Sequence, residues 1–260
     1  MKLPLIYISF LALLFCSCAE DNDDNLTAQT HATISFEFTH NWDDTSVTSA
    51  DFDALSYTNA NGETMSIEKL RYLISDVTFH LTTGENIVVE GYNLVDVTED
   101  NNLVYTLPQD IEFGSFSNVS FTFGFDNEDN YNNSYPDLNS ASWNVPDMMG
   151  GGYHYMQLEG KFLDGTSTEV GYAYHAIRAV NMMAMPMVFE DTFFDVDLGP
   201  MTIGSDTNIE VKMNIAEWFK NPNTWDLNTL NNNLMGNFDA QVMMYENGQN
   251  VFSLGAVTQE

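Results

Sequence analysis

The chain has 260 residues, with 38 Asp and Glu side chains against seven Lys and Arg, and a formal net charge of −31. This charge repels nucleic acids and anionic membrane surfaces, so it excludes both as binding partners, and it raises the local concentration of cations. It therefore favours a metal ion or another cation as partner, although acidity also serves solubility.

The first residues are organised as a secretory signal. Lys2 precedes an apolar run from residue 3 to residue 15, and Ser17 stands directly before Cys18. A basic start, an apolar run too short to cross a bilayer and a small residue at its end are typical of signal peptides. Because a small residue followed by cysteine is the cleavage pattern of bacterial lipoproteins, residues 1–17 are predicted to be a lipoprotein signal peptide and Cys18 the lipidated first residue. An ordinary signal peptide cut nearby is the alternative.

An acidic tether is expected over residues 18–31. The residues after Cys18 (AEDNDDN) are too polar to pack. They are similar to the acidic export signal of Bacteroidetes lipoproteins, which predicts an outer-membrane protein that is lipid-anchored and surface-exposed; a simple tether explains the same residues. Both cysteines lie at or before residue 18, so the mature domain is expected to have neither a disulfide nor a thiolate metal ligand.

Residues 32–260 have the pattern of strands and turns. Ile34, Phe36 and Phe38 alternate with polar residues, the period of two that is typical of a half-buried strand. Further strands are expected at residues 70–81, 86–95, 119–125, 153–162, 171–179, 188–198 and 208–215, and a helical turn at residues 215–220. Aromatic content is 13%, and no linker marks a domain boundary. The prediction is a single all-β domain, an antiparallel β-sandwich with long loops and little helix.

Enzyme signatures are missing from the sequence. It contains no Gly-rich phosphate loop, no Gly-x-Ser-x-Gly elbow and no His-Glu-x-x-His motif. Carboxylates are too numerous for any pair to stand out as a glycosidase dyad. The chain is therefore expected to be a binding protein and not an enzyme.

Three of the five histidines, His40, His154 and His175, continue small or apolar faces of expected strands. Each should therefore point inward, and a single inward histidine is more often a hydrogen-bonded core residue than a ligand. His31 and His80 lie beside the tether and beside a turn, and both are expected to be solvated.

Methionine is abundant, with 14 residues, and several stand close to the histidines in sequence: Met148, Met149 and four methionines between residues 182 and 187. Imidazole and thioether without thiolate suit copper, and the thioether favours Cu(I). The alternative is that methionine fills gaps in an irregular core.

Five short motifs follow one another along the chain: YTNANGE at 57–63, LRYLISDV at 70–77, YNLVD at 92–96, FGFD at 123–126 and GYHYMQLEG at 152–160. Together with Trp218 and Phe219 they resemble the MbnP-like family, the methanobactin-partner copper-binding proteins. The resemblance spans residues 34–219, and the chain is similar to a Bacteroidetes-type lipoprotein member of that family.

The resemblance implies a β-sandwich of the cell envelope that binds copper through histidines, with His40 and His175 near the two family positions. It also implies a di-haem peroxidase partner, which in some relatives oxidises a tryptophan near the site to kynurenine. This chain departs from that pattern, because Asp147, Met148 and Met149 stand where relatives carry tryptophans. Trp143 belongs to a different motif.

The predicted metal site consists of His154 and His175, with His40 as third nitrogen ligand and Met149 as the soft ligand. A sandwich could bring these residues together, and the glycines at 150–152 leave room for Met149 to fold back. Glu37 and Glu159 are expected to be solvated or structural. The predicted function is a cell-envelope lipoprotein that binds copper for acquisition, storage or handling.

Two further interpretations stay open. The acidic loop from Asp126 to Asp137 has oxygen ligands enough for calcium, or its side chains cap turns. Alternatively, the protein is a surface interaction module that binds glycan or protein, with structural His and Met residues. Aromatic side chains that could stack on sugars lie beside polar loops: Trp42, Trp143, Tyr131 and Tyr135. Proximity of the histidines would favour copper.

Overall fold

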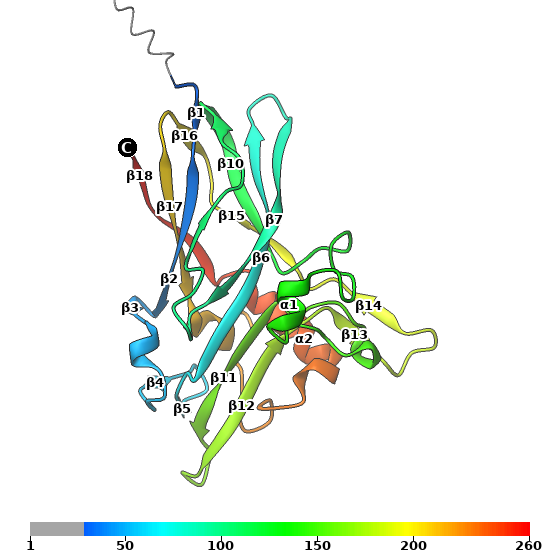
Figure 1. Ribbon diagram of the computed structural model, residues 1–260. Coiled ribbons are helices and arrows are strands. Elements are labelled where there is room, and N and C mark those ends of the chain that lie inside the picture. Colours follow the sequence, from blue (N-terminus) through cyan, green and yellow to red (C-terminus); the bar gives the residue numbers. More distant parts are fainter. Residues whose placement is uncertain (1–28) are drawn as a thin grey trace, which may run out of the picture.

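The computed structural model describes residues 29–260, and its framework is two β-sheets packed face to face (Figure 1). Among the described residues strands make up 45% and helices 13%, which confirms the predicted all-β class. The predicted signal peptide, Cys18 and most of the tether lie outside the described residues.

The larger sheet has nine strands and is built around the long strand β6. β6 pairs with β7, β10 and β11, and β11 continues to β12 at the edge. The strand bounds are β4 Tyr57–Thr58, β5 Thr64–Met65, β6 Lys69–Leu81, β7 Asn86–Asp96, β10 Gly114–Phe123, β11 Met156–Leu163, β12 Glu169–Ala176, β15 Phe194–Asp197 and β16 Met201–Ile203.

The smaller sheet has five strands, and its central strand β2 pairs in parallel with β17. Its members are β2 Ile34–Trp42, β3 Thr45–Ser46, β8 Val104–Thr106, β17 Thr207–Asn214 and β18 Phe252–Gln259. Two short pairs lie apart from both sheets: β1 His31–Ala32 with β9 Ile111–Glu112, and β13 Ala179–Asn181 with β14 Val188–Glu190.

Aromatic side chains fill the space between the two sheets. Phe38 of β2 packs edge-on against Tyr72 of β6 and Phe121 of β10, with ring centroids 6.0 and 6.1 Å away. Each fully buried aromatic side chain of this kind stabilises the fold by roughly 1.5–3 kcal/mol. Tyr72 therefore marks the inner face of the nine-stranded sheet, and Arg71 beside it points to the outer face, because successive residues of a strand alternate.

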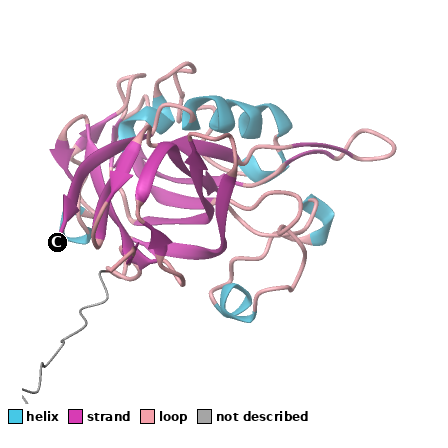
Figure 2. Ribbon diagram, turned by 90° about the horizontal axis from the view of Figure 1, so that it is seen from above, coloured by secondary structure: helices cyan, strands magenta, loops and turns pink. Residues whose placement is uncertain are grey.

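Short helices lie around the sheets (Figure 2): α1 Pro136–Ser140, α2 Phe238–Gly248, and the 3-10 turns η1 Ser49–Asp51, η2 Asp147–Met149, η3 Ile215–Phe219 and η4 Leu234–Gly236. The helical turn expected at 215–220 is confirmed as η3, whereas α2 was not predicted. Its start is capped by Asn237, whose side chain accepts from the amide of Ala240. Among the described residues no helix is long and apolar enough to cross a membrane.

The strand expected at residues 171–179 is interrupted in the structure. β12 ends at Ala176, and β13 begins at Ala179. Between them the amide of Ile177 donates to Gln241 Oε1 at 2.8 Å, and its carbonyl accepts from Thr192 Oγ1 at 2.6 Å. Side chains thus satisfy the Ile177 backbone in place of a neighbouring strand, which allows the chain to leave the sheet here.

Candidate metal site

His154 and His175 lie side by side on the outer face of the nine-stranded sheet, with ring centroids 5.3 Å apart and ring planes at 83°. His154 precedes β11. Its backbone amide donates a hydrogen bond to the carbonyl of Trp143, which fixes the position of the residue. His175 stands on β12, where it pairs with Gln157 of β11. We call His154 and His175 the histidine pair.

The hydrogen bond of His154 fixes which ring nitrogen is free. Its Nδ1 lies 2.9 Å from the Trp143 carbonyl oxygen, which only accepts, so Nδ1 carries the proton. Burial lowers the pKa of His154 to about 4, so the ring is neutral at pH 7. Nε2 is therefore a bare lone pair, and it is buried without a hydrogen-bond partner in the part of the chain that the structure describes.

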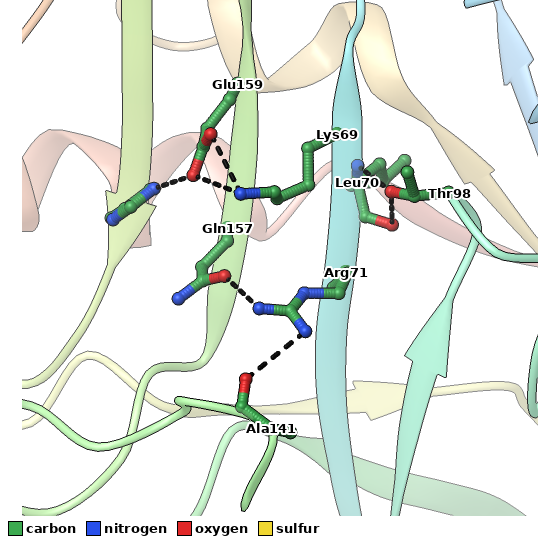
Figure 3. Close-up of polar contacts among 8 residues, drawn as sticks. Lys69, Leu70, Arg71, Thr98, Ala141, Gln157 and Glu159 are labelled. Carbon is green, nitrogen blue, oxygen red and sulfur yellow. Dashed lines mark hydrogen bonds and ion pairs between the residues drawn. The ribbon is translucent and has the colours of Figure 1, made fainter. Parts of the chain in front are cut away.

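Glu159 orients the second ring of the histidine pair. Its Oε1 accepts from His175 Nε2 at 2.8 Å, and both of its oxygens lie 3.0 Å from Lys69 Nζ (Figure 3). The hydrogen bond from His175, together with Lys69, lowers the pKa of Glu159 to about 2. Nε2 of His175 is thus the protonated nitrogen, and Nδ1 is left open. Carboxylates hold metal-binding imidazoles in this way.

Arg71 forms the remaining wall beside the histidine pair. Its guanidinium donates to Gln157 Oε1 at 2.5 Å and to the Ala141 carbonyl at 3.4 Å (Figure 3), and it lies 5.1 Å from the centre of the Trp143 ring. The pair is therefore flanked by two cations, Arg71 and Lys69, and one carboxylate. A hard divalent ion needs several carboxylate oxygens, which are not present here among the described residues, whereas a soft ion can be bound by neutral nitrogen.

His40 does not join the histidine pair, contrary to the prediction. Its Nε2 lies 3.0 Å from Tyr72 Oη, between the two sheets, and burial lowers its pKa to about 4. Tyr72 faces inward and Arg71 outward, so the sheet separates His40 from the pair. The three-histidine site predicted from the sequence is therefore not formed, and His40 is a hydrogen-bonded core histidine.

The predicted direction of His175 is also corrected. The sequence pattern placed it inward with its small neighbours, but the inward residues of β12 are Tyr172, Tyr174 and Ala176, which are all buried. The two tyrosine rings bury more apolar surface than alanine side chains would, and they determine which face of the strand meets the core. His175 is consequently on the outer face with Glu159.

Met149, the predicted soft ligand, lies in η2 at the far end of the loop from His154. The base of that loop is closed where the Val145 amide bonds to the Gly152 carbonyl, next to the Trp143–His154 contact. The tip packs elsewhere, because a Cβ added to Gly150 would come within 2.8 Å of the Phe189 ring of β14. Met149 thus belongs to the surface near the β13–β14 hairpin.

Four side chains of the site were missed from the sequence: Lys69, Arg71, Gln157 and Glu159. Glu159 is correctly expected on the face opposite Met156 and Leu158, but His154 and His175 are expected on inward faces, and the structure places both histidines on the outer face with Glu159. A signal for the two cations existed, since the whole chain has only seven Lys and Arg. Two of them, Lys69 and Arg71, stand two residues apart on one face of β6, beside β11, which His154 precedes.

The acidic loop uses several of its carboxylate oxygens in local structure. Asp126 Oδ1 accepts from the amides of Glu128 and Asp129 at 2.8 and 3.1 Å, and Asp137 accepts from Tyr92 Oη at 2.6 Å. Over residues 29–260, no three or more His, Cys, Asp or Glu side chains are grouped so as to hold a metal ion. The loop therefore fits the capped-turn interpretation and gives no support to calcium.

The aromatic platform expected of a glycan-binding module is largely internal. Trp143 is fully buried and Trp42 is 8% exposed, whereas Tyr131 is 60% exposed. Trp42 packs between Tyr57 and Phe219 as part of the core. Both tryptophans are therefore structural, and the interaction-module interpretation loses its two largest stacking surfaces.

The fold and the site define a β-sandwich protein with two adjacent histidines, His154 buried and His175 partly buried, on the outer face of its larger sheet. The model of the MbnP family matches residues 31–241. The chain therefore belongs to the MbnP family, which is linked to copper and methanobactin handling. Among solved structures it is similar to MbnP from Methylosinus trichosporium, with 9% identity over 74% of this chain and 78% of that chain and a TM-score of 0.46. No curated protein matches the sequence.

Proposed function

We propose that this protein binds copper as Cu(I) between His154 Nε2 and His175 Nδ1, for acquisition, storage or handling of the metal. The observation that carries the proposal is the buried lone pair on His154 Nε2, which lacks a partner among the described residues. A buried acceptor without a partner costs about 1–3 kcal/mol, and a bound ion would remove that cost. Two imidazole ligands with few carboxylates suit copper better than calcium or magnesium.

The surroundings of the pair support a metal site that is prepared before the ion arrives. The Trp143 carbonyl fixes the tautomer of His154, and Glu159 fixes that of His175. His154 therefore presents a bare Nε2, and the hydrogen bond through Nε2 of His175 turns the Nδ1 side of that ring away from Glu159. Such second-shell hydrogen bonds usually contribute 10–100-fold to metal affinity. Copper is cargo in this proposal and takes part in no reaction.

The cellular location is part of the same proposal. An apolar run followed by Ser17 and Cys18, and then an acidic stretch, support a lipoprotein held on the outer membrane by its lipid. The peroxidase partner stays a prediction from the family resemblance. The tryptophan beside the pair is Trp143, whose ring centre lies 5.7 Å from that of His154.

A chelator competition with Cu(I) under anaerobic conditions tests the copper proposal. Replacing either member of the pair, His154→Ala or His175→Ala, should weaken Cu(I) binding at this site by at least about tenfold, which is about 1.4 kcal/mol. The matched controls are His31→Ala and His80→Ala, which remove imidazoles elsewhere and should leave the affinity unchanged. Equal affinities for all four variants and the wild type would refute the proposal.

Membrane attachment is tested separately with Cys18→Ala. The variant should leave the membrane fraction, because a lipid chain is the proposed anchor. Its presence in the membrane fraction at the wild-type level would contradict the lipoprotein assignment and would leave the copper proposal untouched.

A further inference from the structure

The loop that joins β13 to β14 carries four methionines at its tip, Met182, Met183, Met185 and Met187, which we call the methionine tip. The hairpin projects from the body of the molecule (yellow-green in Figure 1; seen edge-on in Figure 2). Met183 and Met185 are 93% and 99% exposed, and Met182 and Met187 are 40% and 45% exposed. These side chains lie largely in water.

Core packing does not explain these four residues. Other methionines of the chain do fill the core, as Met65, Met156 and Met213 are fully buried. The methionines at the tip bury little apolar surface. A cluster of exposed thioether side chains is unusual on the surface of a globular domain. Within residues 182–187 the sequence is MMAMPM, so four of six side chains carry a soft sulfur.

The turn brings the four sulfur-bearing residues into one small region. The last strand pair is Asn181 with Val188, so Met182 and Met187 continue the two arms directly opposite each other. Asn181 shapes the turn, because its side-chain oxygen accepts from the Met183 amide at 3.1 Å. Six residues between paired strand ends cannot separate widely, and long, flexible methionine side chains can therefore converge on one ion.

The base of the hairpin is fixed to the rest of the protein. The Arg178 guanidinium lies 4.4 Å from the ring centre of Phe189, and the same ring packs against the backbone at Gly150. The Met182 side chain also reaches the body, since a Cβ on Gly236 would lie 3.1 Å from Met182 Cε, which fits its lower exposure of 40%. The tip thus presents exposed thioether side chains on a hairpin whose base is held against the body.

We propose that the methionine tip is a Cu(I)-binding site, separate from the histidine pair, that captures the ion from the surroundings. Thioether ligands select Cu(I) over hard cations and over oxidised copper. The net charge of −31 raises the concentration of any cation near the surface. The capture site itself does not depend on the proposed function; only its role in supplying the histidine pair rests on it.

The experiment replaces all four tip methionines by leucine in the mature chain and titrates it anaerobically with Cu(I) against a chelator. Leucine keeps the size and apolar character of methionine and removes only the sulfur. The matched control is Met201→Leu, a buried position on β16 in the nine-stranded sheet. The wild type and the control should bind about two Cu(I) ions, and the fourfold variant about one.

A second readout identifies the ligands directly. With methionine methyl groups labelled with carbon-13, addition of Ag⁺ as a redox-inert mimic of Cu(I) should shift the signals of the four tip residues. The fourfold variant removes these signals and thereby assigns them. Wild-type stoichiometry in the variant, or tip signals that do not move, would overturn the proposal.

This experiment distinguishes a failure of the methionine-tip proposal from a failure of the histidine-pair proposal. His154→Ala should abolish binding at the histidine pair and leave the methyl shifts of the tip intact. If His154→Ala has no effect while the fourfold variant loses one ion, the tip is supported and the proposed function is not. If only the leucine variant is without effect, the tip proposal is wrong and the histidine pair stands.

Discussion

Single hydrogen bonds decide which residues of this protein are free to bind a metal. His40 and His154 are both buried, and burial lowers the pKa of each to about 4. His40 uses its Nε2 on Tyr72, whereas His154 uses Nδ1 on a backbone carbonyl and leaves Nε2 open. The same residue type is therefore a core residue at one position and a candidate ligand at the other.

This difference predicts that His40→Gln leaves Cu(I) affinity unchanged. Glutamine can still bond to the Tyr72 hydroxyl, so the variant should fold, with a loss of about 1 kcal/mol in the free energy of unfolding. Chelator competition measures the affinity, and urea denaturation measures the stability. A tenfold weaker affinity in a variant of near wild-type stability would return His40 to the metal site.

Glu159 is predicted to act on the metal through His175. In Glu159→Ala the ring loses its hydrogen-bond partner and Cu(I) affinity should fall about tenfold or more, as is usual for such carboxylates. In Glu159→Gln an oxygen still accepts from His175 Nε2, so most of the affinity should return. Equal losses of Cu(I) affinity in both variants would indicate that the charge of Glu159 determines the affinity, and not its hydrogen bond to the His175 ring.

At the scale of elements, the outer-face site depends on the break between β12 and β13. Gln241 of α2 bridges this break, as its oxygen accepts from the Ile177 amide and its nitrogen donates to the His175 and Leu234 carbonyls at 2.9 and 3.1 Å. The side chain is 1% exposed. An unpredicted helix thus holds the backbone of one member of the histidine pair.

Gln241→Leu should therefore destabilise the protein by about 2–4 kcal/mol, because it leaves three buried backbone groups without partners. Urea denaturation measures the effect. The matched control is Gln249→Leu just after α2, where the side chain is exposed and bonds only to the Tyr245 carbonyl. A similar, small effect of both substitutions would contradict the bridging role.

The strands could be predicted because alternation of large apolar residues is strong, as in Ile34, Phe36 and Phe38. His154 and His175 could be selected as candidate ligands because imidazole binds metals. The sequence did not show which face of the sheet the two side chains occupy. The phase of β12 depends on which face meets the opposing sheet, a tertiary property that favoured Tyr172 and Tyr174. The partnership of Glu159 with His175 depends on strand register, which no local pattern encodes.

For the molecule as a whole, the excess of carboxylates costs stability where they crowd together. Asp76 lies at a bulge of β6 with a φ of 47°, and burial, with the charges of Asp129 and Asp126, raises its pKa to about 6. The native state then holds a proton that the unfolded state has lost. Stability therefore falls as the pH rises from about 4 to about 6.

Asp76→Asn should remove the loss of stability that ionisation of Asp76 causes. The gain at pH 7 is expected to be about 1 kcal/mol, less than the full pKa shift, because water screens a half-exposed carboxylate. Near pH 4 the gain should vanish. Asp44→Asn is the control, because Asp44 is an exposed aspartate that also has a positive φ, 69°. Urea denaturation at both pH values checks this, and an equal gain at both would contradict it.

The central claim, a copper ion held by the histidine pair, is tested most directly by anomalous diffraction at the copper edge from Cu(I)-loaded crystals. To keep the histidine site separate from the methionine tip, the crystals should contain the fourfold leucine variant. The account predicts one strong peak between His154 Nε2 and His175 Nδ1. A peak beside His40, or anywhere else while the pair stays empty, would contradict it.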